Sequence, residues 1–329
     1  MPTPLSLAPK LAEALGLKTE LFLKREDQHP FGSHKGRSIP KMIEKYAAEG
    51  QRDFVISSSG NAALAAAMEI NEYNEKNKEK ISLKIFVGEN IPKDKMEMIN
   101  GVIARSLPAG KAGTATKQFQ WDRHAPSGLA MTLIQTANPK QSAFLEEKNK
   151  QAKNLRQSTD DSALIGYEDL AKELAEIKNL AAVFVPTSSG TTAQGLWLGF
   201  KKFGLDPQIH IVQTTACHPM VEEKKLDSLR QLADRGNDKK NEDDSRSLAD
   251  AIVDKVAHRK EKVLAALNES NGAGWVASDE EIKTAIALAE KTEGVKISAN
   301  SALSLVGLKK ALEQGRRFNG ATVCLITGQ

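Results

Sequence analysis

Short apolar runs rich in Val and Ile alternate along this chain with longer stretches whose apolar residues recur at helical spacing. Runs of this length and composition are typical of strands buried on both faces. Strand–helix alternation indicates a parallel sheet covered by helices, so we predict an α/β fold. The predicted strands are residues 54–57, 83–87, 182–186, 209–213 and 322–326, and the predicted helices are residues 62–73, 167–177, 191–203 and 279–290.

Local signals refine this outline. Ser278 precedes the last predicted helix and Glu281 follows three residues later, which is the pattern of a capping box. Residues 71–80 and 236–247 are almost wholly polar, and we interpret both as surface loops. Residues 107–156 are polar and irregular, and we expect them to contain a boundary between domains.

Length and composition exclude several classes of protein. A chain of 329 residues exceeds one usual core, so two domains are expected. The net charge of +4 is small and dispersed, which argues against nucleic-acid and membrane-surface binding. No apolar run approaches the roughly 20 residues of a spanning helix, and the N-terminus lacks a signal-peptide pattern. We therefore predict a soluble, cytoplasmic protein.

The two cysteines, Cys217 and Cys324, lie far apart in the sequence. Neither belongs to a CxxC pair or lies near a histidine cluster, so we expect no disulfide framework and no metal site. Two buried reduced thiols fit the predicted cytoplasmic location.

A lysine begins a predicted helix after the turn at residues 29–32. Ser33 can cap this helix, whose first turn then holds His34 and Lys35. The helix macrodipole disfavours a cation at this end, so Lys35 is either solvent-exposed or placed for chemistry. On this segment alone, a surface lysine is the default interpretation.

A loop of small residues joins the strand at residues 54–57 to its helix. Small residues let the backbone approach a ligand, and the N–H groups at a helix start favour an anion such as a carboxylate. A plain connecting loop with Asn61 as the helix cap explains the pattern equally well. The candidate residues are Ser58, Ser59, Gly60 and Asn61.

A second loop, after the strand at residues 182–186, combines hydroxyls with the N–H groups of a helix start, which suits a phosphate monoester. No lysine follows its glycine, so an ATP-binding P-loop is disfavoured. A turn without a ligand is about equally compatible. The candidate residues are Ser188, Ser189, Gly190, Thr191 and Thr192.

The last predicted strand leads to Thr327. A hydroxyl at the carboxyl end of a parallel strand lies where α/β sheets bind ligands. Alone, however, the position fits a plain strand end better. The order of lysine, first loop, second loop and terminal hydroxyl carries more information than any one of them.

In this order the chain resembles fold-type II pyridoxal-phosphate enzymes, the tryptophan synthase β-like superfamily, and looks most like threonine synthases. The resemblance runs from "TPLSLAPKLAEALGLKTELFLKRED" to the end and is weakest across residues 107–156. Its most specific part is the succession "ESNGAGWVASDEEIKTAIALAEKTEGV", "SALSLVGLKKALEQG" and "VCLITG".

The resemblance implies a two-domain enzyme with parallel-rich sheets and with pyridoxal 5'-phosphate in the interdomain cleft. The larger, cofactor-binding domain would comprise residues 1–48 and 155–329. Residues 49–154 would form the smaller domain, which carries the Ser/Gly/Asn substrate loop. Members are commonly homodimers that act on small amino acids, so we expect both properties here.

The resemblance also implies residue roles. Lys35 in "GSHKGR" matches the lysine that forms the Schiff base and serves as acid and base. Asn61 matches the asparagine that bonds the phenolic oxygen of the cofactor, and Thr327 the hydroxyl that faces the pyridine nitrogen. The loop of Ser58, Ser59, Gly60 and Asn61 matches the substrate-carboxylate loop, and the loop of Ser188, Ser189, Gly190, Thr191 and Thr192 matches the cofactor-phosphate loop.

The chain departs from threonine synthases at several positions. They usually have Phe at His34 and Asp at Gly36, and their phosphate loop is built on Gly and Asn. They have Glu-Pro where this chain has Ser298 and Ala299. These departures leave the substrate open.

The predicted reaction converts O-phospho-L-homoserine and water to L-threonine and phosphate. It requires a second phosphate pocket, for which Arg37 and the basic residues of 111–123 are candidates. The alternatives are a serine or threonine dehydratase, or a cysteine synthase-like β-replacement enzyme. A relative of this fold that has lost activity is less favoured.

Overall fold

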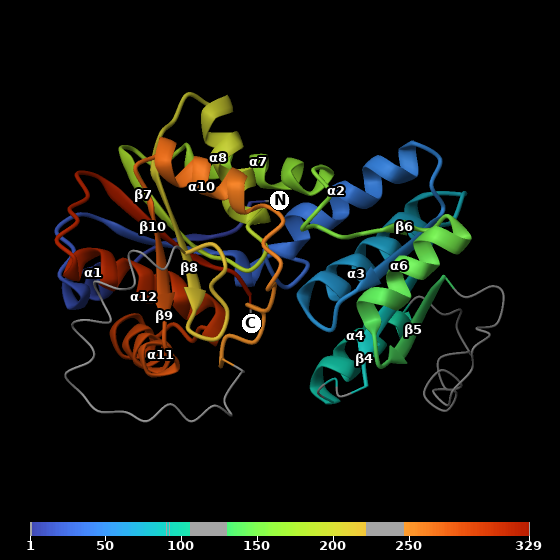
Figure 1. The fold of residues 1–329 in the computed structure, drawn as a ribbon. Coiled ribbons are helices and arrows are strands. Elements are labelled where there is room, and N and C mark those ends of the chain that lie inside the picture. Colours follow the sequence, from blue (N-terminus) through green and yellow to red (C-terminus); the bar gives the residue numbers. More distant parts are fainter. Residues whose placement is uncertain (1, 90, 92, 106–129, 222–246, 329) are drawn as a thin grey trace. The chain divides into compact units, whose positions relative to one another are not determined.

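The computed structural model describes residues 2–89, 91, 93–105, 130–221 and 247–328 (Figure 1). Two units make up the chain. The first unit comprises Met1–His29 and Tyr167–Gln329, and the second comprises Pro30–Gly166.

The first unit is built on a six-stranded sheet. Its strands are β1 (Leu5–Leu7), β2 (Leu21–Arg25), β7 (Leu180–Pro186), β8 (Gln208–Thr214), β9 (Ala273–Ala277) and β10 (Ala321–Ile326). Their order is β1-β2-β10-β7-β8-β9. β1 pairs antiparallel with β2, and all other neighbouring strands pair in parallel.

Helices cover both faces of this sheet, as Figure 1 shows. α1 (Pro9–Leu15), α11 (Asp279–Glu293) and α12 (Ala299–Glu313) cover one face. α8 (Thr191–Lys202), α10 (Lys260–Glu269) and the later part of α7 (Ser162–Leu174) cover the other. Alternate residues of β7 therefore enter different clusters, Phe184 on the α12 side and Val183 and Val185 on the α8 side. This double burial explains the nearly continuous apolar runs of the sequence.

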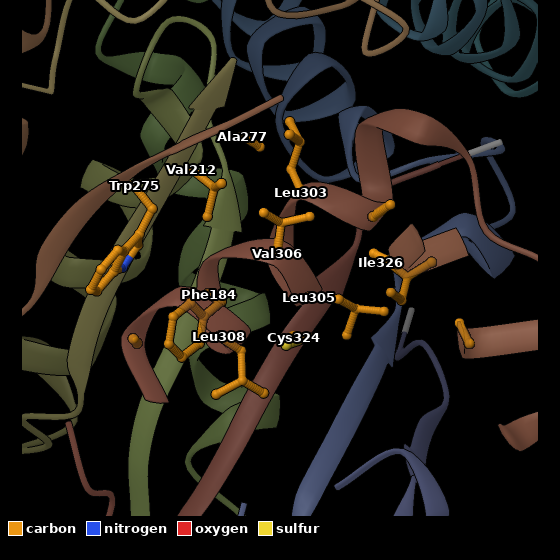
Figure 2. Packing of buried hydrophobic residues seen from close by; sticks show 14 of the residues in the cluster. Phe184, Val212, Trp275, Ala277, Leu303, Leu305, Val306, Leu308, Cys324 and Ile326 are labelled. Atoms are coloured by element: carbon orange, nitrogen blue, oxygen red, sulfur yellow. The ribbon is translucent and has the colours of Figure 1, made fainter. Parts of the chain in front are cut away.

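α12 packs closely on the sheet (Figure 2). Its Leu305 and Leu308 lie beside Cys324 and Phe184. A glycine makes the close approach of this helix feasible, because a Cβ on Gly307 would lie 2.4 Å from Cγ2 of Val212. The middle of α12 is therefore packed directly against β8.

The second unit contains a four-stranded sheet. Its strands are β3 (Asp53–Ser57), β4 (Ser82–Gly88), β5 (Met131–Thr136) and β6 (Lys153–Asn154). They pair in parallel in the order β5-β4-β3-β6. α2 (Lys35–Ala48), α3 (Asn61–Lys76) and α4 (Lys93–Arg105) share one core with this sheet, whereas α6 (Pro139–Lys150) packs its Ala143 in a separate cluster with Val55 and Phe86.

The predicted α/β fold is confirmed, and each predicted strand and helix is present with ends shifted by a few residues. The capping box is also confirmed, since the Glu281 N–H donates to Ser278 Oγ at 3.3 Å and the Ser278 N–H donates to the Glu281 carboxylate at 2.8 Å. Cys217 and Cys324 are buried and free. Across the described residues, no helix is long and apolar enough to cross a membrane.

Two predictions about irregular segments were wrong. Residues 71–76 continue α3 instead of forming a loop. None of them is buried, so polar residues are tolerated there. The stretch predicted as irregular contains β5, α6 and β6 in its later part. α6 was not predicted because its one buried residue is Ala143, so its sequence has almost no apolar periodicity. Residues 107–129 and 236–246 lie outside the described residues.

The units divide the chain at different places from the predicted domains. The predicted domain boundaries follow residues 48 and 154, whereas the chain passes from one unit to the other after His29 and again after Gly166. α2 joins the second unit because Ile39, Met42 and Ile43 are buried in one cluster with the core of that sheet. The domain assignment and the cleft position of the cofactor stay predictions.

A buried carboxyl group in α3 gives a stability prediction. Burial, together with repulsion from Glu44 and Glu72, raises the pKa of Glu69 to about 7. Because this pKa lies above the ordinary value of 4.5, the folded state binds the proton more tightly, and stability is lost as pH rises from 4.5 through 7. Glu69→Gln should raise the free energy of unfolding by about 2 kcal/mol at pH 8 and by little near pH 4.5.

Urea unfolding at both pH values measures this difference. Glu75→Gln, at an exposed position of the same helix, is the matched control and should change neither value. An equal gain at both pH values for Glu69→Gln would show that burial of the charge is not the cause.

Candidate functional site

Lys35 is the first residue of α2 and follows a tight turn. Gly32 in this turn has a φ of 76°, a left-handed conformation that favours glycine. The hydroxyl of Ser33 accepts a hydrogen bond from the Lys35 N–H at 3.3 Å, and the Ser33 carbonyl accepts from the Gly36 N–H at 3.0 Å. Ser33 is therefore not the cap, contrary to the prediction, because His34 is the N-cap of α2 and no described side chain caps this helix. Ser33 instead shapes the turn before the helix and fixes the backbone of Lys35.

The amine of Lys35 lies in a desolvated environment. Burial lowers the pKa of Lys35 from 10.5 to about 8. Within the described part of the chain, we find no ion pair or hydrogen bond for its ammonium group. The residue is only partly exposed, so the surface-lysine interpretation is disfavoured. At pH 7 about a tenth of this amine is therefore unprotonated and nucleophilic, a far larger fraction than for an ordinary lysine.

A contact with α7 holds the first turn of α2 in place. A Cβ on Gly166 would lie 1.9 Å from the carbonyl oxygen of Arg37 and 2.7 Å from Cα of Ser38, so only glycine permits this approach. Gln157 Nε2 also donates a hydrogen bond to Ser38 Oγ. Arg37, a candidate for a second phosphate pocket, is buried at this contact. The other candidates, in residues 111–123, lie outside the described residues.

A polar network connects the later part of α2 to other residues of the second unit. Burial alone would raise the pKa of Asp160, but hydrogen bonds from Ser162, Lys153 and Tyr46 lower it to about 2. Tyr46 on α2 donates to Asp160 Oδ2 at 2.7 Å, and Lys153 Nζ lies 2.9 Å from the same oxygen. The helix that carries Lys35 is therefore anchored at both ends.

The lowered pKa predicts unusual reactivity. Labelling of Lys35 by an amine-directed reagent should rise with pH to a plateau above about pH 9, whereas an ordinary lysine, with a pKa of 10.5, continues to gain reactivity up to about pH 11. Peptide mass spectrometry across pH 6 to 11 measures both classes in one experiment. If labelling of Lys35 rose in parallel with labelling of the exposed lysines up to the highest pH, the inferred desolvation would be contradicted.

The first Ser/Gly loop connects β3 to α3. Gly60 is the N-cap of α3 and Asn61 its first helical residue, and within the described structure no side chain caps this helix. Asn61 is therefore not the cap, contrary to one interpretation of the sequence. The hydroxyl of Ser58 accepts from the Gly60 N–H at 3.3 Å, which shapes the loop. The Ala63 N–H already donates to the Gly60 carbonyl at 3.0 Å, whereas among the described hydrogen bonds none uses the N–H groups of Asn61 and Ala62, which suit an anion.

This loop lies beside the turn that precedes Lys35. α2 and α3 pack together, and a Cβ on Gly32 would lie 3.6 Å from Cδ2 of Leu64 in the first turn of α3. Within the second unit, the structure thus brings together the predicted lysine and the loop of Ser58, Ser59, Gly60 and Asn61.

The second loop lies in the first unit, between β7 and α8. Gly190 is the N-cap of α8 and has a φ of 85°, and a Cβ there would lie 2.6 Å from Cγ2 of Val263. Only glycine fits this backbone. Thr191 and Thr192 are buried, and the hydroxyls of Ser189 and Thr191 lie 2.9 Å apart.

Ser188 has a defined role in this loop. Its hydroxyl accepts hydrogen bonds from the N–H groups of Val253 and Asp254 at 3.2 and 3.3 Å. Because a hydroxyl has two acceptor sites, its proton remains for donation to a ligand. Together with the uncapped start of α8, this gives a set of donors suited to a phosphate.

Thr327 is buried at the end of β10. β10 is paired in parallel with β7, and Cys324 lies opposite Phe184, so the two strands end at the same edge of the sheet. The structure therefore places Thr327 and the loop of Ser188–Thr192 at one carboxyl edge, where α/β sheets bind ligands.

Some residues of the site were not identified from the sequence. Gly166 packs against the carbonyl of Arg37, and Ser301 Oγ donates to the carbonyl oxygen of Gly328, the residue after Thr327, at 2.9 Å. Ser298 was noted only as a departure from threonine synthases. An isolated glycine inside a helical pattern is a signal that could have drawn attention to Gly166. His34, the N-cap of α2, is partly exposed beside Lys35.

Comparison with known proteins gives a consistent result. The model of the family described as "Pyridoxal-phosphate dependent enzyme" matches residues 1–328. A threonine synthase of Methanosarcina acetivorans is 26% identical over 333 residues, which cover 99% of this chain and 74% of that protein. A threonine synthase of Methanocaldococcus jannaschii is 26% identical over 336 residues, with the same coverage of 99% and 74%.

Solved structures share the fold. The processed threonine deaminase isoform 2 of Solanum lycopersicum superposes with a TM-score of 0.73 at 19% identity and covers 99% of this chain and 78% of its own. Maize serine racemase gives a TM-score of 0.72 at 15% identity, with coverage of 99% and 87%.

Proposed function

We propose that this chain, which belongs to the family of pyridoxal-phosphate dependent enzymes, is an amino-acid lyase of threonine synthase type. Its cofactor is pyridoxal 5'-phosphate, as the family implies. The observation that carries the proposal is the desolvated amine of Lys35 at the start of α2, in a chain that aligns over 99% of its length with threonine synthases.

The residues present fit this cofactor. Lys35 offers an unprotonated amine for covalent attachment of the aldehyde. The loop at Gly190 has a left-handed backbone packed against Val263, and it presents the hydroxyls of Ser188 to Thr192 at the start of α8. When bound, the cofactor withdraws electrons from an attached amino acid.

We assign roles to the other residues on the same basis. Ser188, Ser189, Gly190, Thr191 and Thr192 hold the cofactor phosphate, and Asn61 donates to the phenolic oxygen. Ser58, Ser59 and Gly60 hold the substrate carboxylate at the start of α3. Thr327 provides a neutral hydroxyl to the pyridine nitrogen, so the ring is not held protonated by a carboxylate.

Lys35 is the acid and base of the proposed reaction. With the cofactor bound, its Nζ would accept the proton at Cα of the substrate and could return it later as an acid. With O-phospho-L-homoserine, phosphate leaves from Cγ and water adds at Cβ, which gives L-threonine. A pKa near 8 suits this role, because an efficient base has a pKa close to the working pH.

A second candidate is a serine or threonine dehydratase. Departures of this chain at His34 and Gly36 favour it, and so does the similarity of its fold to a threonine deaminase. A dehydratase needs no pocket for a phosphate on its substrate. A cysteine synthase-like β-replacement enzyme would use the same residues with a different second substrate.

Product analysis distinguishes these reactions. The purified protein, loaded with pyridoxal phosphate, is incubated separately with O-phospho-L-homoserine, L-threonine, L-serine and O-acetyl-L-serine plus sulfide. Equimolar phosphate and L-threonine from the first substrate support the proposal. Keto acid from free L-threonine or L-serine, without reaction of phosphohomoserine, would replace it with the dehydratase, and cysteine formation would select the β-replacement enzyme.

A further inference from the structure

The end of β10 is bound by two serines from the start of α12. Ser298 Oγ donates to the carbonyl oxygen of Gly328 at 2.6 Å, and Ser301 Oγ donates to the same oxygen at 2.9 Å. The Gly328 N–H in turn donates to Ser301 Oγ at 3.4 Å. Both polar groups of the residue that follows Thr327 are therefore held by one helical turn.

This arrangement constrains Thr327 directly. The N–H of Gly328 lies in the same peptide plane as the carbonyl of Thr327, so its bond to Ser301 limits rotation about the Thr327 Cα–C bond. On the other side, Thr327 follows the buried strand β10. Since a β-branched side chain has few rotamers on a fixed backbone, fixing the backbone also limits the direction of the hydroxyl.

The supporting turn is itself fixed. Ser298 is the N-cap of α12 and accepts a hydrogen bond from the Ser301 N–H. The side chain of Asn300 bridges two residues of the preceding chain, donating to Asp250 Oδ1 at 3.0 Å and accepting from the Ala251 N–H at 3.1 Å. Ser301 is completely buried.

We propose that Ser298 and Ser301 are positioning residues, which hold the Thr327 hydroxyl in the direction of the cofactor's ring nitrogen by binding Gly328. This inference rests on the proposed function, because it assigns Thr327 to the cofactor. The two hydroxyls fill both acceptor positions of the Gly328 carbonyl oxygen, so this end of the chain is held from two directions.

A neighbouring serine offers a matched control. Ser304 lies one turn further along α12 and is also buried. Its hydroxyl donates to the Ser301 carbonyl at 2.9 Å, inside the helix, and we find no contact with Gly328 among its described bonds. Ser304→Ala therefore removes a buried hydroxyl from the same helix without touching the end of β10.

The test compares the visible spectrum of the lysine-bound cofactor, and its change with pH, across a set of variants. Thr327→Ala defines the change caused by loss of the hydroxyl. Ser301→Ala and Ser298→Ala should shift the spectrum in the same direction, and neither should add to the shift in a double variant with Thr327→Ala. Cofactor release should accelerate about tenfold in Ser301→Ala, the effect expected for one buried hydrogen bond.

The remaining variants separate positioning from general stability. Ser298→Thr keeps the hydroxyl at a partly exposed N-cap and should preserve the wild-type spectrum, which keeps the test informative if Ser301→Ala fails to fold. Ser304→Ala should lower only the melting temperature. Hydrogen exchange of the C-terminal peptide gives a second readout, and exchange should be faster in Ser301→Ala.

The outcomes are distinguishable. A wild-type protein without a lysine-bound cofactor overturns both the proposed function and this inference. A spectrum that changes in Thr327→Ala but not in Ser298→Ala or Ser301→Ala overturns the inference alone. The inference also fails if Ser304→Ala shifts the spectrum as much as Ser301→Ala.

Discussion

Lys35→Ala is expected to abolish covalent attachment of pyridoxal phosphate and to lower turnover by roughly 10⁴-fold or more. The variant loses both the nucleophile and the acid–base group, each of which contributes strongly to catalysis. Lys35→Arg should be almost as inactive, because a guanidinium stays protonated at any working pH. Turnover with the substrate identified by product analysis measures the loss.

Lys41→Ala is the matched control. Lys41 lies on the same helix and pairs with Glu44 at the surface. This variant should retain wild-type turnover and the wild-type spectrum. Retention of more than about a tenth of the activity in Lys35→Ala would contradict the assigned role, since acid–base catalysis alone typically supplies about 10²–10⁴-fold.

Gly190→Ala is expected to weaken cofactor binding about 100-fold. Gly190 has a φ of 85°, which L-residues rarely adopt, and the added Cβ would lie 2.6 Å from Val263 and 3.1 Å from Met220. The backbone strain costs about 1–2 kcal/mol, and the overlap with a packed core adds about 1–3 kcal/mol. The loop must shift to relieve both, which moves the donors that we assign to the phosphate. Titration of cofactor-free protein with pyridoxal phosphate measures the change.

Two variants isolate the steric part. Gly204 has a φ of 68°, and a Cβ there would meet no atom within 4 Å, so Gly204→Ala carries the backbone strain without the overlap. It should lower stability and leave cofactor affinity unchanged. Val263→Ala in the Gly190→Ala background should recover part of the affinity. Unaltered affinity in Gly190→Ala would refute a role for this loop in binding the phosphate.

The sequence predicted the elements whose residues are buried on both faces. β7 and β8 have consecutive apolar residues because helices cover both sides of their sheet. β9 was not predicted, since "AGWVA" contains only one β-branched residue and its strand character depends on pairing with β8. The polar end of α3 was misinterpreted because exposed helix surfaces tolerate residues that also form loops.

The sequence predicted which motifs form the candidate site and their order along the chain. It did not predict the burial and contacts of the site residues. From the sequence around it alone, Lys35 was best interpreted as a surface residue. Its lowered pKa depends on burial by parts of the chain that local sequence does not identify. The role of Gly166 is likewise set by the backbone of α2, far away in sequence. Contacts of this kind follow from tertiary packing, and periodicity carries no information about them.

Reduction with borohydride tests the central claim most directly. Borohydride converts the bond between a lysine and the cofactor aldehyde to a stable secondary amine, which survives digestion and can be located by mass spectrometry. We predict that the phosphopyridoxyl group is found on Lys35 in wild-type protein and that Lys35→Ala carries none. A label on a different lysine, or no label after loading with pyridoxal phosphate, would contradict the assignment of Lys35 as the cofactor-binding residue.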